Sequence, residues 1–148
     1  MEIKQIHENK KDYLELLLLA DEQESMIDRY LEPGDLFVLD DEGVKGVCVV
    51  LHLGGTEYEI KNIAVEPHCQ GKGYGRKLIE FVCAWYRGRC TVLFVGTGDS
   101  PLTVPFYERC GFVLSHRIKD FFTDNYDHPI IEDGVLLRDM VVLKRELA

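Results

Sequence analysis

Residues 59–76 read EIKNIAVEPHCQGKGYGR, and this stretch decides the fold. Its apolar part, which ends in Ile63-Ala64-Val65, predicts a strand, the glycine-rich part predicts a loop, and the segment that follows predicts a helix. Such a loop exposes several backbone N–H groups, and the start of the helix adds partial positive charge. The stretch therefore predicts a site for a phosphorylated ligand and suits a pyrophosphate. Three cations in an otherwise acidic chain support this: Lys72, Arg76 and Lys77.

Two common nucleotide-binding motifs do not fit the glycine pattern. The nucleotide P-loop requires Gly-Lys followed by Ser or Thr, and the chain contains no such triplet. The dinucleotide fingerprint G-x-G-x-x-G fits Gly71 and Gly73, but Arg76 stands where its third glycine should be. Judged by its residues alone, the loop either binds another phosphorylated ligand or is an ordinary glycine-rich turn.

The full string narrows the choice through a resemblance to a known family. Gln70-x-x-Gly73-x-Gly75, after a strand that ends Ile63-Ala64-Val65, resembles the acetyl-coenzyme A (acetyl-CoA) signature of the GNAT superfamily of N-acetyltransferases. About thirty residues further on, residues 105–112 read PFYERCGF, which is similar to the later family motif of a helix with Phe-Tyr-Glu followed by Gly-Phe at the next strand. The resemblance covers nearly the whole chain and implies acetyl-CoA as cosubstrate.

Hydrophobic periodicity along the rest of the chain predicts an α/β fold. Apolar residues recur at helical spacing over residues 10–31, 74–86 and 101–109, and we expect Leu78, Phe81, Val82 and Trp85 to face inward from the second of these helices. Alternating or continuous apolar runs predict seven strands, at residues 2–6, 35–39, 44–53, 57–65, 90–95, 112–121 and 135–143. The order matches the GNAT fold, a mixed, mostly antiparallel seven-stranded sheet flanked by helices. No linker or repeat interrupts residues 1–148, so we expect a single domain.

Composition limits the partners and the location. The formal net charge of −9 argues against a nucleic-acid partner and favours a cationic one, although acidity alone also aids solubility. The longest leucine run, residues 16–19, is far too short to cross a bilayer, and the polar start does not read as a signal peptide. Five cysteines without a C-x-x-C pair suggest buried thiols in a cytoplasmic protein. The histidines lack metal-ligand spacing, so we expect no metal site.

The resemblance implies how acetyl-CoA is held. The sheet would splay beside Ile63, Ala64 and Val65, whose backbone groups would pair with the pantetheine amides as a strand pairs with an edge. Ser100 stands where the family often has asparagine, and its hydroxyl can still bind the pantetheine arm. The pyrophosphate would be held by the loop and the helix start, with glycines where a side chain would collide with the phosphates: Gln70, Gly71, Lys72, Gly73, Tyr74, Gly75 and Arg76.

The implied chemistry is attack of an amine on a thioester. Tyr107 matches the family tyrosine that protonates the leaving thiolate, although a packing role would place the same residue there. Glu59 is the candidate base, because several family members carry a glutamate six residues before the position of Val65, but a water molecule could replace it. Strand alternation would put Glu59 on one face with Lys61 and Ile63. The N–H of Val65 could stabilise the oxyanion.

The sequence defines the acceptor substrate less closely than the coenzyme. We expect a primary amine of a small molecule, and two alternatives stay open: a coenzyme-binding module without turnover, and an N-acetyltransferase that acts on proteins or peptides. The loop at residues 120–133 contains five carboxylates that could select a cationic amine or only face solvent. The C-terminal strand could pair across a two-fold axis in a homodimer.

Overall fold

The computed structural model describes residues 1–147, and a seven-stranded sheet forms its centre. The strand order is β1-β2-β3-β4-β5-β9-β6, and every neighbouring pair is antiparallel except β4 with β5. The expected mixed, mostly antiparallel sheet is therefore confirmed. Two further short strands pair with each other, β7 (Ile131–Glu132) and β8 (Val135–Leu136). The strands of the main sheet are β1 (Glu2–Ile6), β2 (Asp35–Asp40), β3 (Val44–Gly54), β4 (Glu57–Val65), β5 (Val92–Gly98), β6 (Val113–Ile118) and β9 (Met140–Glu146).

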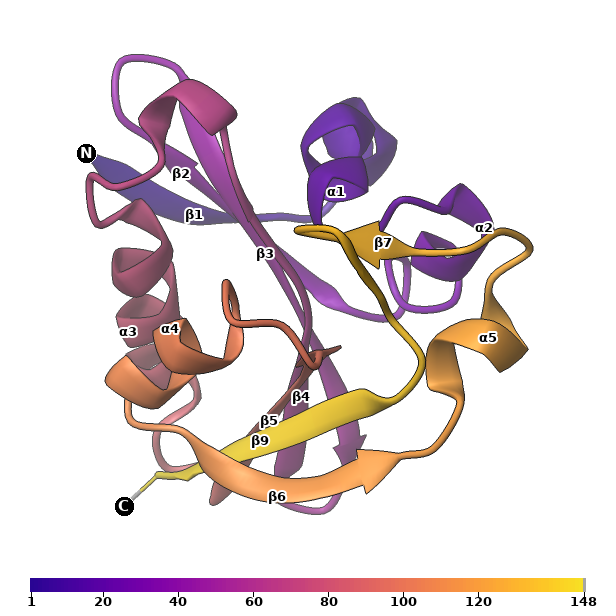
Figure 1. The fold of residues 1–148 in the computed structure, drawn as a ribbon. Helices are drawn as coiled ribbons and strands as arrows, with labels where there is room; N and C mark the ends of the chain where they lie inside the picture. Colours follow the sequence, from indigo (N-terminus) through magenta and orange to yellow (C-terminus); the bar gives the residue numbers. More distant parts are fainter. Residues whose placement is uncertain (148) are drawn as a thin grey trace.

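Helices cover the two faces of the sheet (Figure 1). On one side, α3 (Tyr74–Tyr86) and α4 (Val104–Arg109) pack on a core that includes Phe37 of β2. On the other side, α1 (Leu14–Ala20) and α2 (Glu24–Ile27) pack on a second core that includes Leu36 of β2. Neighbouring β2 residues enter opposite cores because successive strand side chains point to opposite faces. A further short helix, α5 (Phe121–Asn125), follows β6 on the same side as α2 (Figure 1).

The parallel pair β4–β5 opens after four residues. Pairing runs from Glu57 with Val92 to Ile60 with Val95, and there it ends. Beyond that point β4 continues to pair with β3, while Gly96–Gly98 of β5 pair with β9. Among residues 1–147, Ile63–Val65 therefore lie on a strand edge that no other strand covers, as the resemblance implied.

The expected long helix over residues 10–31 is wrong. The chain forms a 3₁₀ turn (Lys10–Tyr13), then α1, then α2, and Asp21 and Gln23 between the two helices are extended. Residues 21–25 read DEQES and supply no apolar side chain, so nothing buries a continuous helix there. The break leaves the Asp21 side chain free to turn toward the sheet.

Four other boundaries also differ from the expected ones. The strand expected at 135–143 is divided into β8 and β9, the strand expected at 112–121 ends at Ile118, the strand expected at 90–95 is β5 (Val92–Gly98), and the helix expected at 101–109 begins at Val104. Trp85, expected inward, is 42% exposed, because Cys83 and Tyr86 occupy the buried stripe of α3. The Trp85 ring covers the rim of the core, where it stacks on Phe81 with ring centroids 5.6 Å apart.

One buried lysine fixes the chain that follows α2. The Nζ of Lys10 donates to the carbonyl oxygens of Leu31 (3.0 Å), Glu32 (3.0 Å) and Gly34 (2.7 Å). These bonds use all three N–H groups of the ammonium, which explains how a cation tolerates burial. The contact anchors the segment that carries Tyr30. No helix in the described part of the chain is both long and apolar enough to cross a membrane.

Candidate active site

A single cavity of about 550 Å³ begins where β4 and β5 part. Its walls are Glu59–Val65 of β4, Val95–Gly98 of β5, and Thr103 and Tyr107 at the start of and within α4. From there the cavity extends to the α1–α2 connection and to the segment around α5, where Asp21, Tyr30 and Tyr126 line it. The free strand edge and the first-helix region thus share one space.

The strand edge presents free backbone groups to this cavity. Glu66 N–H donates to Lys45 O on the β3 side (2.8 Å). Because N–H directions alternate along an antiparallel strand, the N–H groups of Ile63 and Val65 point away from β3. The Val65 carbonyl, which points the same way, accepts a hydrogen bond from Nε2 of Gln70 (3.3 Å). A ligand with amide groups can pair with this edge.

The glycine loop takes its shape from positive φ angles. Gly71 has φ 82° and Gly73, the N-cap residue of α3, has φ 85°. No side chain within residues 1–147 caps α3, so its first N–H groups are available to an anion. Lys72 and Arg76 are exposed beside them. This arrangement fits a phosphate group.

Gly75 and Gly73 are required by different features of the protein itself. A Cβ at Gly75 would lie 3.1 Å from Cζ of Phe106, so the structure assigns this glycine to the close approach of α3 and α4. A Cβ at Gly73 would meet nothing within 4 Å, so its backbone angle is what requires glycine among the described residues. Tyr74 points away from the loop and donates from its hydroxyl to Oδ2 of Asp41 (2.6 Å).

Tyr107 lies in the cavity wall and is only 7% exposed. Phe106 and Phe112 pack edge-on against its ring, with centroids 5.2 Å and 6.0 Å away. Burial, and to a smaller extent nearby cysteines and Glu132, raise the pKa of Tyr107 above its ordinary value. Its hydroxyl therefore carries a proton at neutral pH and can donate it into the cavity.

Glu59 also lines the cavity, but on a different face from the one expected. Asn62 pairs with Val49 and Ile60 pairs with Val50, so Lys61 is an extra residue, a β-bulge. Ile60 and Ile63 consequently share the α3 side of the sheet, while Glu59 lies on the α1 side with Asn62. Oε1 of Glu59 is 3.4 Å from Nζ of Lys61, and the Glu59 side chain is 16% exposed.

Ser100 is buried and serves the turn before α4. Its side-chain oxygen accepts a hydrogen bond from Leu102 N–H (3.1 Å), and the residue is 2% exposed. The residues of this region that line the cavity are Thr97 and Thr103, whose hydroxyls are 2.8 Å apart. The structure brings Tyr107, Glu59 and Ile63–Val65 together around one space, and Ser100 lies outside its wall.

The far end of the cavity contains four residues that the sequence did not single out. The Asp21 carboxylate accepts hydrogen bonds from the hydroxyls of Tyr30 (2.9 Å) and Tyr126 (2.7 Å). Nδ2 of Asn62 donates to the Tyr30 hydroxyl (3.0 Å) and to Leu17 O (2.9 Å). We call Asp21, Tyr30, Asn62 and Tyr126 the Asp21 cluster. Its one sequence signal was Asn62, since asparagine is depleted in strands.

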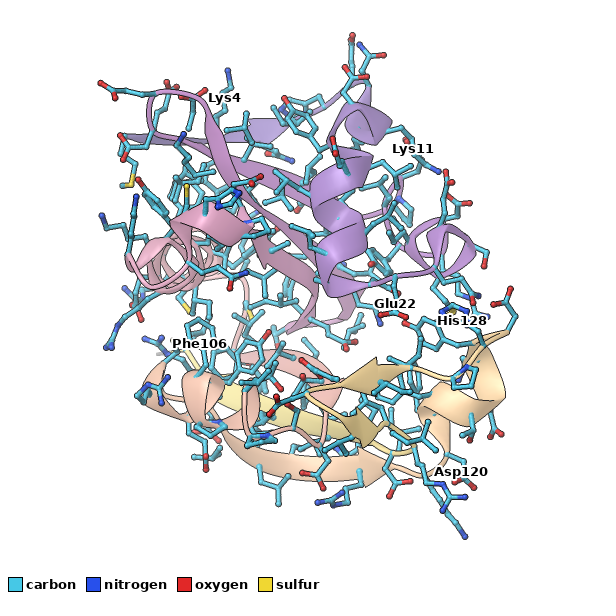
Figure 2. All side chains as sticks on the ribbon, turned by 45° about the horizontal axis from the view of Figure 1, so that its top comes forward. Lys4, Lys11, Glu22, Phe106, Asp120 and His128 are labelled. Carbon is cyan, nitrogen blue, oxygen red and sulfur yellow. The ribbon has the colours of Figure 1, made fainter. Side chains whose placement is uncertain are left out.

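Electrostatics keep the two tyrosines of the cluster protonated. Burial and then the Asp21 carboxylate raise the pKa of both Tyr30 and Tyr126. Next to the cluster, Nε2 of His128 lies 3.2 Å from Oε1 of Glu22, and Figure 2 shows these two side chains meeting between the first helices and the α5 region. Asp127 N–H also donates to Oε1 of Gln23 (3.0 Å). Residues 126–128, which follow α5, thus contact the α1–α2 connection, and we call them the strap.

Comparisons with known proteins agree with this geometry. A family model described as an acetyltransferase (GNAT) domain matches residues 32–114, more than half of the chain. The chain is 35% identical over 144 residues to the uncharacterized N-acetyltransferase YvbK of Bacillus subtilis (strain 168), covering 95% of this chain and 92% of that protein.

Two solved structures are similar over nearly the full length. A GNAT family acetyltransferase from Elizabethkingia anophelis, solved with acetyl-CoA bound, has a TM-score of 0.93 at 34% identity, covering 99% of this chain and 97% of that one. An IAA acetyltransferase from Bacillus cereus ATCC 14579 has a TM-score of 0.90 at 38% identity, covering 99% of both chains. The chain therefore belongs to the GNAT family of acetyltransferases, enzymes that take their acetyl group from acetyl-CoA.

Proposed function

We propose that this chain transfers the acetyl group of acetyl-CoA directly to a primary amine of a small molecule while both substrates are bound. One observation carries the proposal: the free strand edge, Tyr107 and the polar Asp21 cluster line the same cavity. A coenzyme arm on the edge and an acceptor near the cluster can therefore occupy it together. Acetyl transfer then needs no acyl-enzyme intermediate.

The coenzyme contacts follow the strand edge and the loop. Backbone groups of Ile63 and Val65 pair with the pantetheine amides, whereas those of Ala64, which we also expected to pair, point toward β3. The uncapped start of α3 holds the pyrophosphate with the loop from Gln70 to Arg76. The Ser100 hydroxyl, which accepts from Leu102 N–H, acts on the pantetheine arm only through the shape of the turn before α4.

The reaction forms one C–N bond and breaks one C–S bond. The neutral amine nitrogen attacks the thioester carbon, and the N–H of Val65 donates to the oxyanion of the tetrahedral intermediate. The intermediate then expels the thiolate, which Tyr107 protonates. Before the attack, Glu59 or a water molecule takes one proton from the ammonium form of the amine, and the proton that the nitrogen loses after the attack returns to Tyr107. The products are the N-acetylated amine and coenzyme A.

The strap over the cavity favours a small acceptor over a peptide. Tyr126, Asp127 and His128 contact the α1–α2 connection from the segment after α5. These contacts bridge that end of the cavity and leave less room there for a peptide chain. A binding module without turnover is disfavoured because Tyr107 lies in the cavity wall with its proton retained.

The proposal is tested by a panel of acceptors with acetyl-CoA, with release of the coenzyme thiol as the readout. We expect turnover with small primary amines and none with the matching alcohols or with peptides that begin with alanine or serine. Mass spectrometry of the acetylated product confirms the acceptor atom. Coenzyme binding without turnover on the whole panel would reject the proposal. Turnover restricted to peptides would mean that the acceptor is a peptide and not a small amine.

Glu59→Gln tests the base. If Glu59 takes the proton, the variant loses about 100-fold in kcat at pH 7, the usual size of a general-base effect. The loss shrinks as the pH approaches ~10, where the amine itself loses its proton. The measurement is the pH profile of kcat with a good amine. Glu57→Gln, an exposed carboxylate on the same strand, is the matched control and should keep the wild-type profile. An identical profile for Glu59→Gln would assign the role to water.

A further inference from the structure

The Asp21 cluster offers hydrogen-bond acceptors to the cavity and no donor. Both N–H bonds of the Asn62 amide are used, on Leu17 O and on the Tyr30 hydroxyl. Both tyrosine hydroxyl protons are used on the Asp21 carboxylate. The remaining lone pairs of the carboxylate and of the Tyr126 oxygen are what a ligand can meet.

The Asn62 amide oxygen lacks a partner within residues 1–147. Asn62 is 3% exposed and lines the cavity, and its Oδ1 is buried without a hydrogen bond to any described residue. A buried acceptor that stays unpaired costs free energy, so native proteins rarely keep one without a function. A donor supplied by a bound molecule would satisfy it.

The surroundings select a cation as that donor. Asp21, Glu22, Glu59 and Glu132 line the cavity against two cations, and both of these are engaged: Lys61 lies beside Glu59, and Arg29 donates to Asn125. The aromatic rings of Tyr126 and Phe122 stack in the same wall with centroids 5.7 Å apart. Carboxylates and aromatic faces together favour an ammonium group, which brings three donors and no acceptor. A hydroxyl group brings only one donor.

We propose that the Asp21 cluster binds a protonated nitrogen of the acceptor other than the one that is acetylated, so that the preferred substrate is an amine with a second ammonium group. This inference rests on the proposed function for the identity of the reacting nitrogen. A nitrogen held against a carboxylate keeps its proton and has no lone pair for attack. The reacting nitrogen must therefore lie apart from the cluster, toward Tyr107 and Glu59.

The test measures binding without turnover. The protein saturated with coenzyme A is titrated calorimetrically at pH 7 with straight-chain diamines of three to six carbons and with the monoamines of equal length. We expect the best diamine to bind at least about 10-fold tighter than its monoamine, because charged hydrogen bonds contribute that much. Asp21→Asn should weaken the diamine by about 10- to 100-fold and the monoamine by less than about 3-fold.

Controls separate recognition from a structural role of the strap. Asp28→Asn makes the same change at an exposed carboxylate paired with Lys11 and should leave both affinities unchanged. Thermal melting of each variant reports whether the fold is kept. Equal binding of diamine and monoamine to the wild type, or an equal loss for both in Asp21→Asn, overturns the inference.

If the Lys61 ammonium group itself occupied the Asp21 cluster, the inference would be wrong. The Nζ of Lys61 lies 6.0 Å from the centroid of the Tyr30 ring. A preference for diamines that appears only in Lys61→Gln would mean that this ammonium group fills the cluster itself. Because binding is read without acetyl transfer, these results stand apart from the amine screen. Acetylation of monoamines and diamines alike would leave the proposed function in place and reject this inference alone.

Discussion

Gly73→Val is expected to weaken acetyl-CoA binding by at least about 100-fold while the chain stays folded. Gly73 has φ 85°, a region that β-branched residues essentially never occupy. A Cβ there meets no described atom within 4 Å, so the strain of the variant lies in its backbone, which must change conformation. That change turns the uncapped N–H groups of α3 away from the pyrophosphate. Calorimetric titration with acetyl-CoA measures the loss.

A matched control exists at the other end of α3. Gly88 has φ 93° and, like Gly73, open space where a Cβ would stand. Gly88→Val should therefore lower the melting temperature about as much as Gly73→Val and leave the affinity for acetyl-CoA unchanged. Wild-type affinity in Gly73→Val would remove the loop from the coenzyme site.

Tyr107→Phe is expected to lower kcat by about 100-fold or more, within the usual range for general acid catalysis. The ring contacts with Phe106 and Phe112 remain, so the dissociation constant of acetyl-CoA should change by less than about 3-fold. Rapid-quench measurement of the acetyl-transfer step, with saturating amine, gives the relevant rate. An unchanged rate would assign Tyr107 to packing.

The pH dependence follows from the raised pKa of Tyr107. An acid is active while it is protonated, and burial moves its loss of the proton above the ordinary tyrosine value near 10. Wild-type kcat should therefore not fall between pH 7 and about 9.5. Tyr86→Phe is a suitable control, because Tyr86 is also buried and donates to Asp35 on the other side of the core. It should cost stability and retain kcat.

The parts of the fold with local signals could be predicted from the sequence. β4 and α3 have the expected bounds because an apolar strand, a glycine-rich loop and a helical stripe follow one another without a gap. The prediction of one helix over residues 10–31 was wrong because the apolar stripe continues on both sides of a polar interruption at Asp21. The prediction that Trp85 faces inward was wrong because hydrophobicity indicates which residues prefer burial, whereas the 3.6-residue repeat decides which of them reach the core.

The Asp21 cluster could not be predicted in the same way. Tyr126 meets Asp21 across 105 residues, and no spacing along the chain encodes that contact. The free strand edge and the glycine loop, where we propose that the coenzyme binds, lie within one continuous stretch, so their pattern could be recognised in the sequence. Asn62 belongs to that stretch, but its importance depends on Leu17 and Tyr30, which only the folded chain brings beside it.

The extra residue at Lys61 decides which face of the sheet each later residue of β4 takes. If Lys61 instead paired with Val49 as an ordinary strand residue, every later side chain of the strand would move to the opposite face. Ile63 would leave the core beneath α3, and the N–H groups of Ile63 and Val65 would turn inward toward β3. The bulge therefore links two properties of β4, the packing of Ile63 beneath α3 and the outward N–H groups that face the cavity.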